Sequence, residues 1–278
     1  MRCVKSLLAA GAASLISSMA FAADMPIAAP PPMYAPPAPP ADFGGWYLRG
    51  DIGFSNQQFK DLHNTNAALY APVVSFQQTS TVNTGGIFDV GVGYRVNNWF
   101  RADVIGQYRG KTNFLATDSY TFTNAGVVTP GVDTYTGTKS EWLVMANAYV
   151  DLGTWWCVTP FIGAGVGAAR VTIDNLVDTN TPTNGVNLAG SGSKWNLAWA
   201  AHAGLAYKIN PSTTLELAYS YVSLGDGVTA NSHNFNAPLS PYVWQVKNIT
   251  SNDLKLGVRW ELNTPPAYAP PPPLVTKG

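Results

Sequence analysis

The side chains that could perform nucleophilic catalysis are few, because the 278-residue chain contains only three histidines. His202 and Ser220 are of the types that act as general base and nucleophile, and Glu216 could orient the histidine, so a hydrolytic triad is one hypothesis. His63 and His233 have no carboxylate cluster near them at metal-ligand spacing. We therefore predict no metal site, and the triad depends on where the chain places its members.

A glycine-rich segment, PFIGAGVGAARV beginning at Pro160, contains the GxGxG pattern of some phosphate-binding loops. Such loops bind dinucleotides between a strand and a following helix, and no βαβ pattern follows this segment. We predict no cofactor here and interpret the segment as a strand whose register is weakly specified.

The elements that must position these residues are strands. The stretch Ser251–Leu262, SNDLKLGVRWEL, alternates apolar and polar residues without interruption, which is the period of a β-strand. Seven other stretches of about ten residues or more alternate in the same way. They are Gly45–Phe54, Gly86–Arg95, Trp99–Arg109, Ser140–Asp151, Thr159–Ile173, Lys194–Ile209 and Thr213–Ser223.

The charges lie on one face of these strands, and no helical segment is available to cover the apolar face. A transmembrane β-barrel has this arrangement, with apolar side chains toward lipid and polar ones toward the lumen. Short turns follow the second, fourth and sixth strands, whereas the other connections are long. We therefore predict an all-β fold, an eight-stranded antiparallel up-and-down transmembrane barrel with four long extracellular loops. These loops are Ser55–Asn83, Gly110–Lys139, Asp174–Ser193 and Leu224–Thr250.

The inward positions carry both signs of charge in nearly equal number. A lumen of about eight strands is only wide enough to be filled by side chains, and an unpaired charge there would be costly. We therefore predict a closed lumen with paired charges; a narrow pore for small solutes is the alternative. The predicted lumen charge network comprises Arg49, Asp51, Asp89, Arg95, Arg101, Asp103, Arg109, Glu141, Lys208, Glu216, Lys255 and Arg259, with Asp151, Asp253 and Glu261 as further inward acids.

Nine tryptophans and thirteen tyrosines form a large aromatic content for a chain with 12% charged residues. Aromatic side chains mark both interfaces of a membrane barrel. The outward aromatic residues sort into two levels, which predict two girdles. The periplasmic level contains Trp46, Tyr94, Phe100, Tyr207 and Trp260, and the outer level contains Tyr108, Trp142, Trp195 and Tyr221, with Phe54.

The ends of the chain have a different composition. Residues 1–22 combine basic Arg2 and Lys5 with an apolar centre and end on small residues, which predicts a secretory signal peptide cleaved near Ala22. Residues 23–43 and 263–278 are rich in proline and are interpreted as extended periplasmic tails; binding of these tails to the cell wall is a hypothesis from composition alone. The barrel would occupy residues 44–262. Sixteen basic and sixteen acidic residues argue against a nucleic-acid partner.

Four motifs carry a family resemblance: GWYLRGDIGFS at Gly45, CVTPFIGAGVGAA at Cys157, LELAYSYVSLGDG at Leu215 and LKLGVRW at Leu254. Together they resemble the porin-family outer-membrane β-barrel proteins of alphaproteobacteria, relatives of the eight-stranded opacity-protein and outer membrane protein A barrels. The resemblance implies a location in the outer membrane of a Gram-negative cell and insertion by the barrel-assembly machinery. It also implies an assembly signal in the closing strand, at Lys255, Gly257, Trp260 and Leu262, although family members usually end on an aromatic residue where Leu262 stands.

Inside such a barrel His202 would lie opposite Ser220 in a packed lumen that lipid cannot reach. We therefore expect no enzyme, and a lipid A modifying activity is the least favoured reading. Binding surfaces usually lie on loops held by a rigid scaffold. The predicted function is an outer-membrane surface protein that supports envelope integrity, with loops that contact lipopolysaccharide and an adhesive or host ligand. Exposed apolar loop residues suited to this are Leu69, Tyr70, Phe114, Phe122, Tyr242 and Trp244.

Overall fold

The computed structural model describes residues 44–181, 183–235 and 242–262. The chain divides into one unit of residues 1–43 and a second of residues 44–278, and the account below concerns the second. The predicted signal peptide and both predicted proline-rich tails lie outside the described residues.

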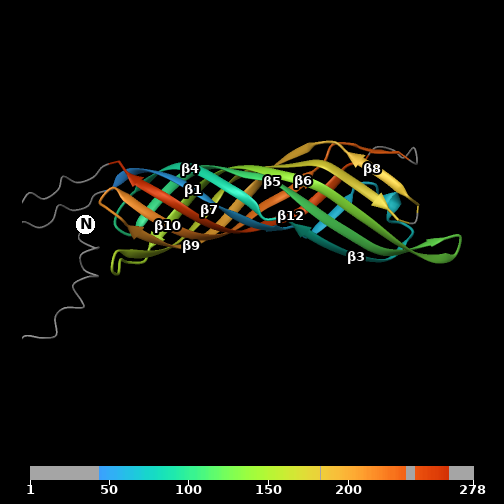
Figure 1. Cartoon of the computed structure of the whole chain (residues 1–278), viewed down its shortest axis with the longest axis horizontal. Helices are drawn as coiled ribbons and strands as arrows, with labels where there is room; N and C mark the ends of the chain where they lie inside the picture. The colour runs from blue at the N-terminus through green and yellow to red at the C-terminus, as the bar shows by residue number, and fades with distance from the viewer. Residues whose placement is uncertain (1–43, 182, 236–241, 263–278) are drawn as a thin grey trace, which may run out of the picture. The chain divides into compact units, whose positions relative to one another are not determined.

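Eight antiparallel strands form a closed ring, because β1 pairs with β12 as well as with β4 (Figure 1). Closure is continuous from Tyr47 opposite Glu261 to Gln58 opposite Thr250. The prediction of an eight-stranded antiparallel barrel is confirmed. In ring order the strands are β1 (Gly45–Gln58), β4 (Gly85–Arg95), β5 (Phe100–Asn124), β6 (Val127–Asp151), β7 (Val158–Asn180), β9 (Gly192–Lys208), β10 (Thr213–Val228) and β12 (Trp244–Glu261).

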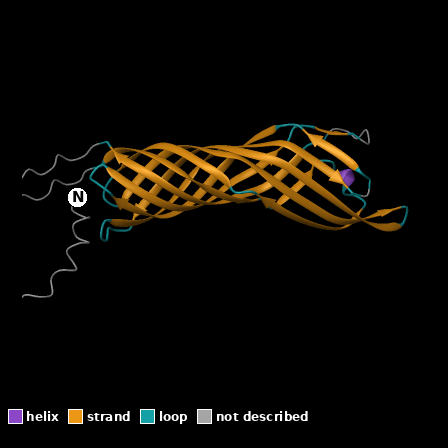
Figure 2. Ribbon diagram, in the orientation of Figure 1, coloured by secondary structure: helices purple, strands orange, loops and turns teal. Residues whose placement is uncertain are grey.

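Four additional strands and one helical turn lie at one end of the ring (Figure 2). We call this end, which carries the long connections, the outer end, and the opposite end the inner end. The additional elements are β2 (Asp61–Asn64), which pairs with β12; the 3-10 turn η1 (Ala67–Leu69); β3 (Val73–Val82), which pairs with β5; β8 (Gly185–Ala189), which pairs with β7; and β11 (Ser232–Asn234), which pairs with β8. Among the described residues, no helix is long and apolar enough to cross a membrane.

Three neighbouring strands are far longer than a membrane crossing requires. β5 and β6 each have 25 residues and β7 has 23, against the roughly 10 that a tilted strand needs. The second long connection therefore contains a paired hairpin that turns at Ala125 and Gly126, both with positive φ, as in tight two-residue turns. Its outward positions on β6, Thr134, Thr136 and Thr138, are β-branched but polar, so they lack the apolar signal of a lipid-facing strand.

Two irregularities separate the membrane-length part of these strands from their extensions. The β5–β6 register shifts between Arg109 and Thr112, and β7 has Asn175 with a φ of 52° where its pairing with β6 shifts. At each irregularity the strand contains one extra residue. The inward side chains, which lie at odd-numbered positions before it, therefore lie at even-numbered positions after it. At the same level Lys111 and Asp174 form an exposed ion pair of 3.1 Å on the outer surface, which indicates that the wall has left the hydrocarbon there.

The interior has two layers. Toward the inner end it is filled by charged side chains, and toward the outer end by a buried apolar cluster that includes Leu143, Val171, Ile249 and Leu62 of β2. Leu62 is fully buried. Its strand lies beside the outer part of β12, so the apolar cluster fills the space above the charges. The sequence predicted the charged layer alone.

Short turns close the inner end. Asn97 accepts hydrogen bonds at Oδ1 from the backbone N–H groups of Trp99 and Phe100, at 2.9 and 2.7 Å. Asn210 accepts in the same way from Ser212 and Thr213, at 2.9 and 2.8 Å. These asparagine side chains thus satisfy backbone amides of the two turns.

Candidate functional site: the barrel interior and the outer cavity

Glu216 of β10 is the centre of the charged layer. Arg259 Nη1 lies 2.9 Å from its Oε1, Arg101 Nη2 lies 3.3 Å from the same oxygen, and Arg49 Nη2 lies 3.5 Å from Oε2. Arg49 also pairs with Asp51 at 2.7 Å and with Asp103 at 2.8 Å. Strand alternation brings these groups inward from four different strands, and burial then forces opposite charges together.

Further ion pairs continue toward the outer end. Lys255 Nζ lies 3.1 Å from Asp89 Oδ2, and Arg109 contacts both carboxylate oxygens of Asp253. Lys139, which the sequence analysis did not single out, lies 2.5 Å from Glu141 and is fully buried. This layer is therefore a dense network rather than an open channel.

The inner mouth holds the least buried of the predicted lumen residues. Arg95 is half-buried there and lies 3.9 Å from Glu261, whereas Arg101, just inside the mouth, is fully buried and lies 3.3 Å from Asp151. Lys208 is exposed and lines, with Arg95 and Arg259, a recess of about 100 Å³. The structure therefore buries ten of the twelve predicted network residues in the interior and leaves Arg95, which is half-buried, and Lys208 at the mouth.

His202 does not form the catalytic arrangement considered above. Its Nδ1 lies 2.8 Å from Ser220 Oγ, as the register implies, but its Nε2 faces the amide oxygen of Asn147 at 3.2 Å. Glu216 is instead engaged by three arginines. Histidine and serine are both buried, and an amide oxygen, unlike a carboxylate, carries no charge that would stabilise an imidazolium. The pair is suited to hydrogen bonding in the interior.

The predicted girdle residues lie on the outside of the wall. Trp46 packs edge-on against Tyr94 with ring centroids 5.3 Å apart, and Tyr108 packs on Trp142 at 4.6 Å. Trp142, Trp195, Trp260 and Tyr207 are exposed, and Phe100, Tyr108 and Tyr221 are half-buried because neighbouring rings cover them. From Phe100 to Tyr108 along β5 is about 26 Å of strand, which at a tilt of about 40° rises about 20 Å along the barrel axis, somewhat less than the roughly 25 Å of a barrel's apolar band.

The closing strand places its predicted assembly residues on both faces. Lys255 and Gly257 point inward, whereas Trp260 and, just after the strand, Leu262 are exposed. A Cβ on Gly257 would overlap the carboxylate of Asp51. Glycine is therefore needed there so that the side chain of Asp51, directly opposite on β1, can lie over β12.

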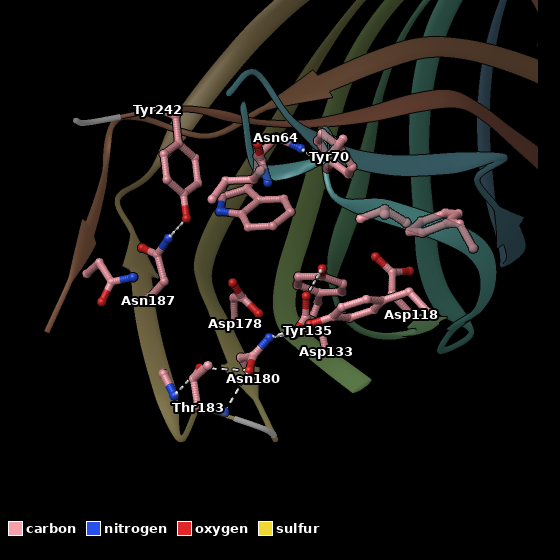
Figure 3. A pocket seen from close by; sticks show the side chains of 17 residues that line it. Asn64, Tyr70, Asp118, Asp133, Tyr135, Asp178, Asn180, Thr183, Asn187 and Tyr242 are labelled. Carbon is pink, nitrogen blue, oxygen red and sulfur yellow. Dashed lines mark hydrogen bonds between the residues drawn. The ribbon is translucent and has the colours of Figure 1, made fainter. Parts of the chain in front are cut away.

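A cavity of about 400 Å³ lies at the outer end, beyond the apolar cluster (Figure 3). Its walls come from the extensions of β5, β6 and β7, from β8, and from the segments around η1 and before β12. Tyr135 and Trp244, with ring centroids 4.8 Å apart, belong both to the apolar cluster and to the lining. Three carboxylates line the cavity, those of Asp118, Asp133 and Asp178.

Two of the three aspartates, Asp118 and Asp133, accept hydrogen bonds from polar but uncharged partners. Asp118 accepts from Gln78 at 2.6 Å, and Asp133 accepts from Tyr120 and Tyr135 at 3.3 Å each. Burial raises the pKa of Asp118 to about 6. Burial and then the charges of Asp133 and Asp118 raise the pKa of Asp178 to about 8, and burial also raises the pKa of Asp133. Among the residues that the structure describes, none supplies a compensating cation to these three carboxylates.

These aspartates fall in stretches that the sequence pattern assigns to loops, although they lie on β5, β6 and β7. A signal was present on β6, where Asp133, Tyr135, Gly137 and Lys139 continue the inward parity of Glu141 without a shift. On β5 and β7 the bulges reverse the parity, so simple alternation fails beyond Arg109. Of the apolar residues expected to be exposed, Phe114, Tyr242 and Trp244 are buried instead. They are covered because the connections fold back onto the barrel as strands.

Comparison with known proteins gives a consistent family. The sequence model of the outer membrane protein β-barrel domain matches residues 8–261. An uncharacterized protein of Brucella abortus is 33% identical over 209 residues, which are 69% of this chain and 72% of that protein. A candidate adhesin of Rickettsia felis is 27% identical over 267 residues, 92% of this chain and 98% of that protein. The crystal structure of Neisserial surface protein A superposes with a TM-score of 0.46 at 19% identity, covering 78% of this chain and 97% of that one.

The family match extends over nearly the whole ring, from the first strand to the closing strand. It agrees with the closed eight-stranded fold and with the resemblance seen in the sequence motifs. The chain therefore belongs to the outer membrane protein β-barrel family and resides in the bacterial outer membrane.

Proposed function

We propose that this protein is an attachment and envelope-stabilising surface barrel, which acts through the strand-built extension at its extracellular end. The observation that carries this proposal is the length of β5, β6 and β7. The residues of β5 beyond Arg109 span about 50 Å of strand. A barrel that only crossed the membrane would not need this wall, whereas a binding surface held above the lipid would.

The interior supports the same proposal. Ion pairs fill the inner layer, and apolar side chains fill the outer layer. A solute would have to displace both, so transport of small solutes is disfavoured. The His202 geometry likewise gives no support to catalysis, because its second nitrogen faces an amide.

The tip of the β5–β6 hairpin is suited to contact with a partner. Val127, Val128 and Val132 are exposed apolar residues on it, and exposed apolar groups on rigid strands can be buried at low entropic cost. The kinship with a candidate adhesin supports attachment as the role of this tip. Membrane lipid and lipopolysaccharide would contact the wall below it.

Two variants test the proposal. In the first, an Asn-Gly turn replaces residues 119–132 and joins Asp118 to Asp133, which lie opposite each other in the register. In the second, Val127, Val128 and Val132 each become Thr, which keeps strand propensity. We expect bacteria that display either variant to attach less to matrix-coated surfaces than bacteria with the wild type, at equal surface amounts.

The matched control is Asp226→Asn. It alters an outer-end carboxylate that lies outside the hairpin and is paired with Lys194 at 2.9 Å. Survival in bile-salt detergent would be measured alongside attachment. Unchanged attachment and unchanged detergent survival with both hairpin variants would refute the proposal.

We propose, further, that the barrel-assembly machinery engages β12 through Lys255, Gly257, Trp260 and Leu262. Two features support this proposal. Trp260 is exposed on the apolar face of β12, and Gly257 lets Asp51 pack closely against the inward face. The proposed contact of the proline-rich tails with cell wall falls on residues outside the described ranges.

A further inference from the structure

In the outer cavity, like-charged side chains lie at neighbouring positions of paired strands. Asp118 of β5 stands directly opposite Asp133 of β6, and Asp178 of β7 stands opposite Tyr135, one inward position along β6 (Figure 3). Like charges directly across a strand pair are destabilising. The barrel's other interior carboxylates lie beside arginine or lysine, but among the described residues no basic side chain lines this cavity or pairs with these three aspartates.

Two buried polar side chains in the lining are also incompletely bonded. Trp244 is 1% exposed and its indole Nε1 has no hydrogen-bond partner. Asn187 is 2% exposed, and its Oδ1 has none, although its Nδ2 donates to Tyr242. Asp178 Oδ1 is a third buried atom without a partner. A buried polar atom without a hydrogen bond costs stability unless a ligand supplies the missing partner. Here two such atoms are acceptors and one is a donor.

Aromatic rings complete the wall. Tyr70, Phe76, Tyr120, Tyr135, Tyr242 and Trp244 all line the cavity. Aromatic faces attract organic cations and exclude water around them. The carboxylates would supply the charge, and a volume of about 400 Å³ holds a small molecule or one long side chain.

We propose that this cavity binds a small organic cation, an ammonium or guanidinium group on a molecule that also offers a hydrogen-bond acceptor to Trp244. The cation would lie among Asp118, Asp133 and Asp178 and relieve their mutual repulsion. The pKa values of these three carboxyl groups are raised, as expected where no positive charge lies beside them. The inference concerns the cavity alone and does not depend on the attachment proposed for the hairpin tip.

The site should bind more tightly as its carboxylates ionise. The pKa values of Asp118 and Asp178, about 6 and about 8, place this change between about pH 5 and about pH 9, with Asp118 ionised and Asp178 about half ionised at pH 8. The other titratable groups facing the cavity are Tyr70, Tyr120, Tyr135 and Tyr242, whose pKa values are all raised by burial, so they stay protonated. Asp61 of β2, paired with His63 at 2.6 Å, also acts on Asp118.

Calorimetric titration of the purified protein in detergent micelles tests the proposal. The probes are N-acetyl-L-argininamide and N-acetyl-L-lysinamide, their neutral counterparts N-acetyl-L-citrullinamide and N-acetyl-L-norleucinamide, and agmatine, which lacks a carbonyl. We expect saturable binding of at least one cationic probe at pH 8, at least tenfold weaker binding at pH 5, and none of the neutral probes. The arginine and lysine arms distinguish guanidinium from ammonium, and agmatine, in which a second ammonium group stands in place of the amide carbonyls, shows whether binding needs an acceptor for Trp244.

Asp118→Asn and Asp178→Asn should each weaken the binding at least tenfold, since each removes a charge but keeps the side-chain shape. Asp226→Asn, a paired carboxylate of the same end outside the cavity lining, should leave it unchanged. Trp244→Phe should weaken the binding of N-acetyl-L-argininamide and leave the binding of agmatine unchanged. Equal binding of citrulline and arginine probes, affinity unaffected by both aspartate variants, or binding of Ca²⁺ without any organic cation would each overturn the proposal.

Discussion

At the scale of single residues, Glu216 has the most demanding environment in the barrel. One buried carboxylate faces Arg49, Arg101 and Arg259 within 3.5 Å, and all three arginines are themselves buried. Its charge therefore compensates several guanidinium groups at once. Removing one member of a buried ionic cluster leaves the others uncompensated, which costs far more than the pair itself contributes.

Glu216→Gln should consequently lower the free energy of unfolding by about 3–5 kcal/mol, measured from urea titration of the refolded protein in lipid vesicles. Lys111→Gln is the matched control, because it breaks the exposed Lys111–Asp174 pair. The control should cost less than about 1 kcal/mol. Similar losses for the two variants would show that burial does not govern these ion pairs.

Which residues face inward could be predicted from local alternation, but which partners they meet could not. Arg49 pairs with Asp103, and Arg109 with Asp253, across strands that are not neighbours in the chain. Those pairings depend on how the ring staggers its strands, and a two-residue period carries no information about stagger. The same limit applies to Asn147, which occupies the place beside His202 that a triad would give to an acid.

At the scale of elements, the two bulges explain why the predicted strands end too early. All eight ring strands were predicted, but Gly110–Lys139 was assigned to a loop although most of it is paired. The inward parity of β5 and β7 reverses at these bulges, and the outward residues beyond them face water rather than lipid. Both changes remove the pattern by which a membrane strand is recognised.

The Asn175 bulge allows a direct test. Its φ of 52° lies in the left-handed region, which asparagine and glycine tolerate and β-branched residues do not. Asn175→Val should lower the free energy of unfolding by roughly 1–2 kcal/mol, whereas Asn175→Gly should change it little. The measurement is again urea unfolding in vesicles. If both variants behaved alike, backbone strain would not be what selects asparagine there.

At the scale of the whole molecule, the interior is closed in two different ways. Ion pairs block the inner half, and apolar side chains, with Leu62 of β2 among them, block the outer half. The sequence could predict the first, because charged residues recur on known strands. It could not predict the second, because β2 returns to the barrel from within a long connection and its four residues carry no periodic signal.

The protein should therefore show no single-channel conductance in a planar lipid bilayer, at a protein amount for which heat-dependent gel migration demonstrates folding. The matched variant is Leu62→Asp, which places a charge in the apolar layer and should loosen it while the ion pairs below remain. Reproducible conductance steps from the wild type would instead establish an open lumen and replace the attachment proposal with a pore.

The paired extension has a consequence for immune recognition. Residues that lie side by side on it come from different parts of the chain, as Phe76 of β3 does with Tyr120 of β5 and, through the next pairing, Gly131 of β6. An antibody footprint on this wall would thus be discontinuous. Sera raised against a linear peptide of residues 110–139 should bind the heat-unfolded protein and fail on intact bacteria, and a vaccine antigen made from this protein would have to be the folded barrel.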